Sequence, residues 1–290
     1  MTDTRNRLRE ILRERSATLA PGVYDGLSAS LTAGAGFRAA YMSGAAVAAA
    51  HGLPDIGLAT QSEMVRQAGL LAGQLDIPLI ADADTGFGDA THTYRTVRLY
   101  EEAGVAAIQL EDQEFPKRCG HLDAKRVVDA EEFAAKIEAA AEARRDPGTV
   151  IVARTDARAT HGFDEALRRV NRYVEAGADM VFVEAPQSLD EVRRVPSEVA
   201  APALFNLVPG GRTPEAGLDV LREAGYALAI MPLLNVGAAA TAMRAALAGA
   251  AAGDLDTTGQ LPVRDLFDSV GLGFWEELRR RYDKGSGARD

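Results

Sequence analysis

Short runs of consecutive apolar residues recur along the chain, and the segments between them are long enough for a helix. Continuous apolar runs, as opposed to alternating ones, are typical of strands covered on both faces, as in parallel sheets flanked by helices. We expect eight strands, at about Leu19–Tyr24, Ala39–Ser43, Pro78–Asp84, Val105–Glu111, Val150–Asp156, Met180–Glu184, Ala203–Leu207 and Ala227–Met231. The pattern therefore predicts an α/β protein with a parallel sheet.

Amphipathic segments between these runs predict helices, among them Ala90–Ala103, Ala130–Arg144, Phe163–Ala176 and Pro214–Ala224. An Ala-Gly step separates helix from strand at four places, and glycine there can adopt the left-handed conformation that ends a helix. The four glycines are Gly36, Gly104, Gly177 and Gly225. Asp89 or Thr91 is expected to cap the helix that begins near residue 90.

Repeated strand–helix units without a linker predict one (β/α)₈ barrel of the TIM type. A chain of 290 residues would otherwise suggest about two domains at roughly 150 residues each, but this barrel takes ~250 residues as one domain. A doubly wound open sheet is the alternative, and it requires a reversal of strand order that a sequence does not reveal. We expect the barrel in residues 1–255 and a C-terminal helical extension in residues 256–290.

The C-terminal part of the chain is apolar beyond the last predicted strand. Val236–Gly253 is rich in alanine and is expected to form a buried helix, followed by a polar break at Gly253–Gly259. From Leu261 onward, aliphatic and aromatic residues such as Phe274 and Trp275 are too many for a solvated tail. This extension is expected to pack on the barrel or on a neighbouring subunit.

Charge and composition limit the classes of partner. The net charge of −10 and the pI near 5.0 make nucleic acid an unlikely ligand, since phosphate binding needs clustered Lys and Arg. The N-terminus lacks the apolar core of a signal peptide, and no stretch has the ~20 strongly apolar residues of a membrane span. A single cysteine cannot form an intrachain disulfide, which fits a reducing compartment. We expect a cytoplasmic protein with a small-molecule substrate.

Polar residues stand at the C-terminal ends of six predicted strands, where a barrel builds its active site. They are Ser43, Asp82 with Asp84, Glu111 with Asp112, Arg154 with Asp156, Glu184, and Asn206. Several carboxylates on one rim are costly unless a cation or substrate compensates their charge. Asp82, Asp84, Glu111 and Asp55 supply hard oxygen ligands suited to Mg²⁺ or Mn²⁺, of which only one or two need bind the ion directly.

The only cysteine, Cys119, lies in the loop after the fourth strand, beside Lys117, Arg118 and His121. Neighbouring positive charges prepare a thiol for proton transfer or nucleophilic attack. A buried structural cysteine is the more common case, but it would not ordinarily lie among charges between Pro116 and Gly120. A zinc site is unlikely because the chain has no second cysteine.

These motifs occur together in a known superfamily. Lys117-Arg118-Cys119-Gly120-His121 resembles the Lys-Lys/Arg-Cys-Gly-His signature of the isocitrate lyase/phosphoenolpyruvate mutase superfamily. Further matching segments, in order along essentially the whole chain, are Ser43-Gly44, Gly52–Gly57, Asp82–Gly88, Glu111–Gln113, Ala153–Ala157 and Glu184-Ala185. The chain is similar to the short branch, which includes methylisocitrate, dimethylmalate and alkylmalate lyases, oxaloacetate hydrolase and carboxyphosphonoenolpyruvate mutase.

The resemblance implies a Mg²⁺-dependent barrel enzyme, with Mn²⁺ as a substitute ion, and it gives roles to particular residues. Substrate would be held by Ser43, Gly44, Ala45, Gly120, Glu184 and Asn206; metal by Asp55, Asp82, Asp84 and Glu111, some through water. The catalytic set would be Cys119 as the acid on a gating loop, Lys117 and His121 beside it, Arg154 on the substrate oxygens, and Tyr41 as a candidate base. It also implies a homotetramer of paired dimers in which the C-terminal segment is exchanged between barrels.

The implied reaction is retro-aldol cleavage of a 2-hydroxy dicarboxylate of the alkylmalate, dimethylmalate or methylisocitrate type, or hydrolysis of oxaloacetate. The Gly-Gly pattern of Asn206–Pro214 is closer to the alkylmalate lyases and speaks against a tricarboxylate, and Cys119-Gly120 disfavours phosphoenolpyruvate mutase and phosphonopyruvate hydrolase activity. Carboxyphosphonoenolpyruvate mutase shares the cysteine motif and is the alternative. A non-catalytic carboxylate-binding protein is a remote one.

Overall fold

The structure is a computed structural model that describes residues 2–120, 124–211, 213–254, 256 and 259–283. Eight parallel strands in this part of the chain close into a barrel, in sequence order with the last paired to the first. The strands are β1 (Thr18–Val23), β2 (Ala40–Met42), β3 (Leu79–Asp82), β4 (Ala107–Glu111), β5 (Val150–Thr155), β6 (Met180–Val183), β7 (Ala203–Asn206) and β8 (Leu228–Met231). The predicted (β/α)₈ TIM-type barrel is confirmed, and its closure rules out the open sheet.

Each predicted strand overlaps an observed one, and the predicted and observed ends coincide or differ by at most two residues. The register brings the polar strand ends side by side: Asp82 on β3 is level with Gln109 on β4, and Glu111 on β4 is level with Arg154 on β5. The residues of interest therefore start from adjacent positions on one rim.

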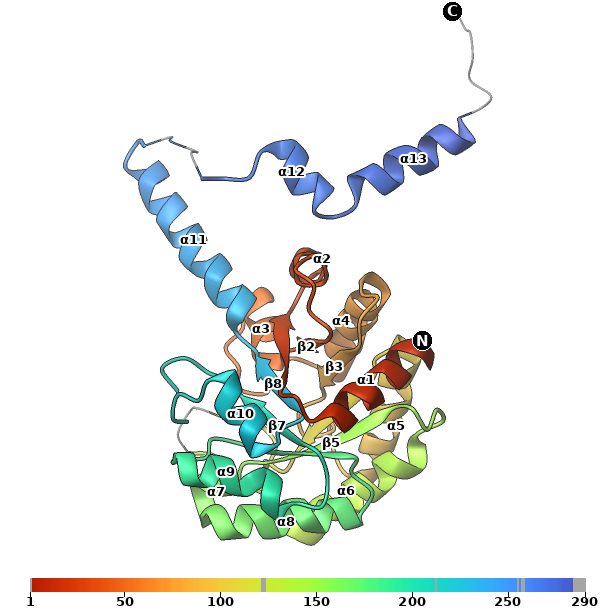
Figure 1. Ribbon diagram of the computed structural model, residues 1–290, viewed down its shortest axis with the longest axis vertical. Helices are drawn as coiled ribbons and strands as arrows, with labels where there is room; N and C mark the ends of the chain where they lie inside the picture. The colour runs from red at the N-terminus through yellow and green to blue at the C-terminus, as the bar shows by residue number, and fades with distance from the viewer. Residues whose placement is uncertain (1, 121–123, 212, 255, 257–258, 284–290) are drawn as a thin grey trace, which may run out of the picture.

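Helices cover the outside of the barrel (Figure 1). They are α2 (Gly26–Gly34), α3 (Gly44–Ala50), α4 (Gln61–Gln74), α5 (Ala90–Ala103), α6 (Ala130–Ala143), α7 (Ala157–His161), α8 (Phe163–Glu175), α9 (Leu189–Glu198) and α10 (Leu218–Ala224). The four junction glycines all have positive φ, between 81° and 112°, as predicted. Asp89 caps α5 by accepting the amides of Thr91 and His92, also as predicted.

The N-terminal helix α1 (Thr2–Glu14) is an element that the apolar runs did not predict. Its residues Leu8, Ile11 and Leu12 are buried in the same cluster as the side chains inside the barrel. Arg5 is also buried and donates to the carbonyls of Glu101 and Val105. Helix α1 therefore covers the end of the barrel core from which the strands start.

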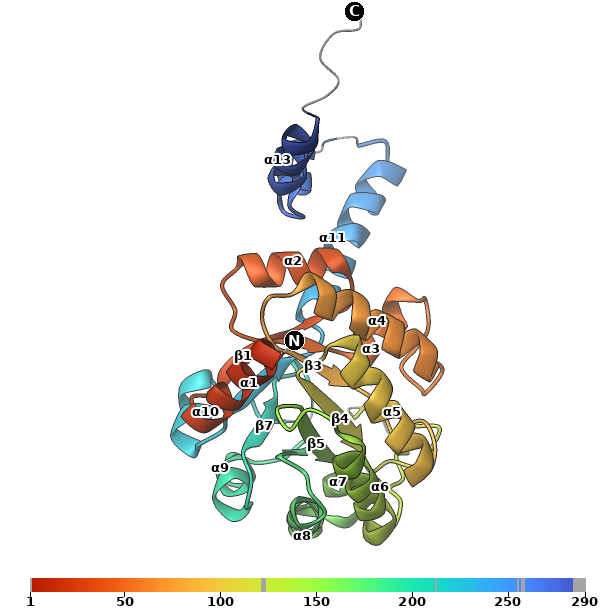
Figure 2. The ribbon, with the colours of Figure 1, turned by 90° about the vertical axis from the view of Figure 1, so that its right-hand side faces the viewer.

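The C-terminal helices extend away from the barrel, as Figures 1 and 2 show from two directions. They are α11 (Leu234–Ala251), α12 (Val263–Asp268) and α13 (Leu272–Tyr282), which we call the C-terminal arm. None of the described residues of these helices is buried, and Leu247, Val263, Phe274 and Trp275 are more than half exposed. The prediction of a buried helix at residues 236–253 is therefore wrong for the single chain, because composition identifies an apolar helix but not the surface that covers it.

Near its start, the arm is held to the barrel by hydrogen bonds. The amide of Asn235 donates to the Gly22 carbonyl of β1 at 2.8 Å and to the Thr32 hydroxyl at 3.1 Å. Gly22 leaves room for the chain to pass, since a Cβ there would lie 1.9 Å from the Pro232 carbonyl oxygen. The helix therefore starts at a fixed point on the rim.

None of the helices in the described ranges has the length and hydropathy needed to cross a bilayer.

Candidate active site

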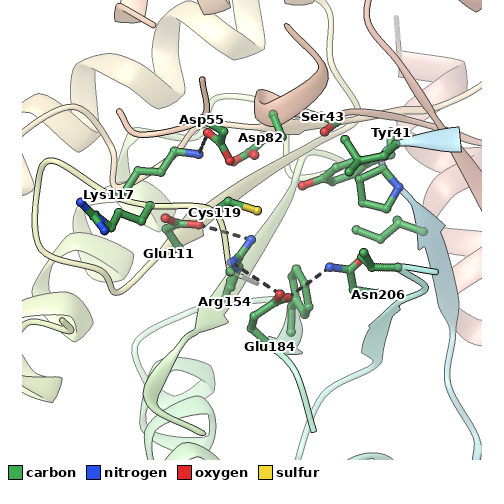
Figure 3. Close-up of a pocket in the computed structure, with 18 residues that line it drawn as sticks. Tyr41, Ser43, Asp55, Asp82, Glu111, Lys117, Cys119, Arg154, Glu184 and Asn206 are labelled. Atoms are coloured by element: carbon green, nitrogen blue, oxygen red, sulfur yellow. Dashed lines mark hydrogen bonds and ion pairs between the residues drawn. The ribbon is translucent and has the colours of Figure 1, made fainter. Parts of the chain in front are cut away.

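A pocket of about 90 Å³ lies at the C-terminal ends of the strands (Figure 3). It is lined by most of the predicted site residues, namely Tyr41, Ser43, Ala45, Asp55, Asp82, Glu111, Lys117, Cys119, Gly120, Arg154, Glu184 and Asn206. Gly44 and Asp84 lie directly beside it, since a Cβ on Gly44 would be 2.8 Å from Asp82 Oδ2 and 3.3 Å from Asp84 Oδ1. His121 falls outside the described residues.

Asp82 and Asp84 reach the same site because the chain turns between them. Strand β3 ends at Asp82, and Asp84 adopts a left-handed φ of 47°. Asp82 accepts the Asp84 amide through Oδ1 at 3.1 Å and the Gly44 amide through Oδ2 at 3.2 Å. A continuing strand would have placed the two carboxylates on opposite faces, so this turn makes them neighbours.

Lys117 is the protein's own cation among these carboxylates. Its ammonium contacts Asp55 Oδ1 at 2.5 Å and Asp84 Oδ1 at 2.9 Å, with only 5% of the side chain exposed. Burial opposes its charge, but Asp84, Glu111, Asp82 and Asp55 together raise the pKa of Lys117 well above its usual value. We call Asp55, Asp82 and Asp84, with Lys117, the acidic side of the pocket.

The acidic side carries more negative charge than Lys117 neutralises. Burial, followed by the charge of Asp84, raises the pKa of Asp82 to about 6. Burial also raises the pKa of Glu111 well above its usual value, and Glu111 Oε1 has no hydrogen-bond partner in the described part of the chain. Both observations indicate a place where a cation would be favoured.

The donor set fits a hard divalent cation that keeps most of its water. Among the described residues, no three His, Cys, Asp or Glu side chains converge to form a complete metal site. Asp82 and Asp84 present neighbouring oxygens, and Mg²⁺ is commonly held by one or two carboxylates with water or substrate filling the other positions. The residues therefore fit the predicted ion with few direct protein ligands.

Arg154 lies on the opposite side of the pocket, held by carboxylates. Its Nε and Nη2 donate to Asp156 at 2.9 and 3.2 Å, Nη1 lies 3.4 Å from Glu111 Oε2, and Nη2 lies 3.9 Å from Glu184 Oε1. Asn206 donates to Glu184 Oε2 at 3.2 Å, and the Phe182 ring lies beneath the guanidinium. We call Arg154, Asp156 and Glu184 the paired side.

Ser43 and Tyr41 occupy the β2 edge of the pocket. Ser43 caps α3 by accepting the Ala46 amide at 3.2 Å, which points the start of this helix at the pocket. Tyr41 donates to Gln109 Oε1 at 3.0 Å, and burial, then the charge of Asp82, raises the pKa of Tyr41 well above its usual value. A phenol with a raised pKa is a poor proton acceptor at neutral pH, so the structure argues against Tyr41 as the base.

Cys119 reaches the pocket on the loop that follows β4. The loop folds over the rim because Gln113 pairs with both backbone groups of Arg118, and the Cys119 amide donates to the Asp55 carbonyl at 3.1 Å. The thiol is half-buried and points into the pocket (Figure 3). This arrangement places a potential proton donor between the acidic and the paired side.

Three residues of the site region were not assigned a role from the sequence. Gln109, fully buried, lies 3.4 Å from Asp82 Oδ1 and links it to Tyr41. Asp112, also fully buried, accepts the Thr155 hydroxyl at 2.6 Å and the Asp156 amide at 2.9 Å. Lys125 contacts Asp156. A polar residue inside an apolar run was the available signal for Gln109.

The chain is similar to known proteins over most of its length. The phosphoenolpyruvate phosphomutase family matches residues 8–251. The chain is 45% identical over 242 residues to 2,3-dimethylmalate lyase of Eubacterium barkeri, covering 83% of this chain and 84% of that one. It is 48% identical over 226 residues to 2-methylisocitrate lyase of Aeropyrum pernix, covering 78% and 73%. It is 41% identical over 284 residues to the chloroplastic carboxyvinyl-carboxyphosphonate phosphorylmutase of Arabidopsis thaliana, covering 95% and 84%.

Solved structures are similar over nearly the full length. Oxaloacetate acetylhydrolase in complex with the inhibitor 3,3-difluorooxalacetate superposes with a TM-score of 0.92 at 33% identity, covering 98% of this chain and 99% of that one. Phosphonopyruvate hydrolase in complex with oxalate and Mg²⁺ superposes with a TM-score of 0.87 at 30% identity, covering 97% and 99%. The chain belongs to the phosphoenolpyruvate phosphomutase family and is a carbon–carbon lyase of the isocitrate lyase/phosphoenolpyruvate mutase superfamily.

Proposed function

We propose that the protein cleaves a 2-hydroxy dicarboxylate of the substituted malate type, by retro-aldol reaction, to a keto acid and a carboxylate. The observation that carries this proposal is the placement of Cys119, Arg154 and the Asp82–Asp84 pair around one small pocket. Such a reaction needs a base for the 2-hydroxyl proton, a charge to stabilise the developing oxyanion and a proton for the departing carbanion. The pocket carboxylates Asp82 and Glu111 would supply the base, and Arg154 and Cys119 the other two groups.

The substrate orientation follows from the charges. One substrate carboxylate would lie at the start of α3, near Ser43, Gly44 and Ala45, and further oxygens would contact Arg154. Mg²⁺ bound beside Asp82 and Asp84 would polarise the oxygens at the centre of the reaction, which is the chemistry that a divalent cation supplies. Arg154 cannot swing away from the substrate because Asp156 holds it through two hydrogen bonds.

Proton delivery is the role of Cys119. When the carbon–carbon bond breaks, its electron pair remains on the carboxylate fragment, which takes a proton to become the product. The Cys119 thiol faces the pocket from the loop and can donate this proton without moving the substrate. The loop also reduces access of water, which would otherwise compete as a proton source.

The substrate choice within the family follows from the pocket. A small cavity with apolar lining by Phe182, Val208, Ile230 and Leu233 suits a dicarboxylate with alkyl groups, such as 2,3-dimethylmalate. Methylisocitrate needs a partner for its third carboxylate, and oxaloacetate has no alkyl group to fill the apolar wall. We therefore rank an alkylmalate first and the other two behind it.

The test is an assay of the purified protein with Mg²⁺ against 2,3-dimethylmalate, 2-methylisocitrate and oxaloacetate, with detection of the keto acid or oxalate released. We expect the highest kcat/KM with the alkylmalate and a loss of about 10³-fold in kcat for Cys119→Ala. Absence of turnover with all three would overturn the lyase proposal. Full activity of Cys119→Ala would exclude the thiol as the proton donor.

A second candidate is the carboxyphosphonoenolpyruvate mutase reaction, favoured by the identity with the Arabidopsis thaliana enzyme over 95% of this chain. Phosphorus NMR with carboxyphosphonoenolpyruvate distinguishes it, since the mutase moves phosphorus from the enol oxygen to carbon with loss of CO₂, so that the keto acid formed carries a carbon–phosphorus bond. A non-catalytic carboxylate-binding protein is the third reading, supported only if Mg²⁺ and Mn²⁺ fail to bind even with pyruvate present.

We further propose that the protein is a cytoplasmic homotetramer in which the C-terminal arm packs on a neighbouring barrel. Its support is the exposure of Leu247, Val263, Phe274 and Trp275, an apolar surface that water disfavours. Truncation at Gly259 is expected to cause dissociation or aggregation, visible by light scattering on a sizing column. An intact tetramer after truncation would refute this arrangement.

A further inference from the structure

Lys125 is a buried cation with no part in the proposed reaction. Only 2% of its side chain is exposed, and its ammonium donates to the Gly120 carbonyl at 2.5 Å and to Asp156 Oδ1 at 2.7 Å. Burying an ammonium is costly unless its charge and hydrogen bonds are both compensated. These two contacts provide that compensation, so they define where the ammonium can lie.

The two partners of Lys125 belong to opposite parts of the active site. Gly120 directly follows Cys119, and Asp156 holds the guanidinium of Arg154 through its Nε and Nη2. Asp156 is itself fixed, because its amide donates to Asp112, which also accepts the hydroxyls of Thr155 and Tyr173. One ammonium therefore connects a rigid anchor on β5 to the loop segment that carries the thiol.

Gly120 packs closely against the guanidinium of Arg154, which is also hydrogen-bonded to Asp156. A Cβ at this position would lie 2.3 Å from Glu184 Oε1 and 2.5 Å from Arg154 Nη2. The backbone of the loop therefore lies against the guanidinium, and the contact with Lys125 keeps it there. In the described ranges, no side chain other than Lys125 donates a hydrogen bond to the Gly120 carbonyl.

We propose that Lys125 is a positioning residue, which ties the Gly120 carbonyl to the Asp156–Arg154 pair and so sets the distance between the Cys119 thiol and the Arg154 guanidinium. This proposal rests on the proposed function only where it predicts an effect on kcat. The positioning itself can be measured without turnover, because Cys119 is the only cysteine of the chain and any thiol-specific reagent reports on it.

The test compares Lys125→Met with Arg126→Met in the full-length protein. Methionine keeps the length and apolar stem of Lys125 but removes its donors, and Arg126 is an exposed neighbour paired with Glu114 at 2.7 Å. Alkylation of Cys119 by iodoacetamide is followed by mass spectrometry, with and without oxalate plus Mg²⁺. We expect Lys125→Met to be alkylated about tenfold faster and to lose the protection by oxalate, with Arg126→Met unchanged.

Steady-state kinetics on the best substrate provide the second readout. We expect Lys125→Met to lower kcat by about 100-fold with KM changed by less than about threefold, because substrate contacts remain and only the proton donor is displaced. If wild type turns over no substrate, the proposed function fails while the alkylation result still decides the role of Lys125.

An alkylation rate within twofold of wild type, with oxalate protection intact, would overturn the proposal even if the melting temperature falls. That combination would mean that Lys125 serves stability alone. Should Lys125→Met fail to fold, Lys125→Gln is measured in its place, because its shorter and uncharged side chain keeps a donor but does not bridge Gly120 and Asp156 as the ammonium does. An intermediate rate for Lys125→Gln supports the proposal, and a wild-type rate contradicts it.

Discussion

Asp82 and Asp156 are both buried aspartates at the rim of the same barrel, yet their pKa values are shifted in opposite directions. Burial, together with Asp84, raises the pKa of Asp82 to about 6. Burial also opposes the charge of Asp156, but Arg154 and Lys125 more than compensate and lower its pKa to about 2. The two sides of the pocket therefore differ in how their negative charge is balanced.

This difference separates the carboxylates whose charge is balanced within the protein from those whose charge would be balanced by a bound cation. On the paired side, Asp156 has cationic partners within 3.2 Å and needs nothing further. On the acidic side, Lys117 faces Asp55, Asp82 and Asp84, so a surplus of negative charge remains. The proposed divalent cation would therefore bind at this surplus, and the proposed substrate would lie between the two sides.

The largest expected effect is on the acidic side. Asp82→Asn removes a charged oxygen ligand while keeping the shape of the side chain, so we expect kcat to fall by about 10³-fold and the affinity for Mg²⁺ to weaken. Activity as a function of Mg²⁺ concentration and calorimetry with Mn²⁺ measure both. Glu114→Gln, in the nearby loop but outside the pocket lining, serves as the control and should behave as wild type. Unchanged metal binding in Asp82→Asn would remove Asp82 from the metal site.

The corresponding change on the paired side should act on stability first. Asp156→Asn leaves Arg154 and Lys125 buried without their shared counter-ion, and we expect a loss of about 3 kcal/mol in the free energy of unfolding. Urea denaturation measures it, with the exposed Asp164→Asn as a control expected to change little. If Asp156→Asn is as stable as wild type, the paired side is not the structural half of the pocket.

A substitution between the two sides tests their separation. Gly120→Ala would place a methyl group 2.3 Å from Glu184 Oε1, so the loop must shift, and we expect kcat to fall by about 100-fold with little change in melting temperature. Gly217→Ala is the matched control, because a Cβ there meets no atom within 4 Å. Equal activity of the two variants would show that the loop tolerates displacement from Arg154.

The last effect is the pH dependence of the stability of the metal-free protein. The pKa of Asp82 is about 6 in the folded protein and 3.8 in the unfolded chain. The folded state therefore binds more protons than the unfolded state between about pH 4 and 6. The stability that this group contributes is therefore complete below this window and falls by roughly 3 kcal/mol as the pH rises through it. Urea unfolding of wild type minus that of Asp82→Asn isolates the effect, and parallel curves for the two proteins would contradict the raised pKa.

The strands were predictable because a parallel strand covered on both faces is a continuous apolar run, and each of the eight predicted runs overlaps an observed strand. The strand-end carboxylates were predictable for the same reason, since a charge that directly follows such a run must lie at the rim. The turn that brings Asp84 beside Asp82 could not be predicted, because the period of a strand does not tell where the strand stops, and the predicted strand ran on to Asp84.

Other features depend on contacts far apart in the chain. No pattern in the sequence distinguishes Lys125 from an exposed lysine. Its buried position depends on Asp156 and Gly120, which contact it in the folded chain. Helix α1 carried a signal that was not used: Leu8, Ile11 and Leu12 are spaced three and four apart, as on one helix face. Helix α11 is exposed in the single chain, and its burial was predicted wrongly for that chain because an apolar composition does not identify a covering surface.

The start of the C-terminal arm lies at the pocket, so the position of the arm and the shape of the pocket are linked. Pro232 and Leu233 line the pocket, and Leu233 directly precedes α11. Two residues further on, the Asn235 side chain is hydrogen-bonded to the Gly22 carbonyl of β1. Whatever binds the arm therefore also restrains a wall of the catalytic pocket. If the arm packs on a neighbouring barrel as proposed, the fraction of arms that are bound rises with protein concentration by mass action. Specific activity should then depend on dilution, so that an enzyme assay at nanomolar concentration reports on assembly as well as on chemistry.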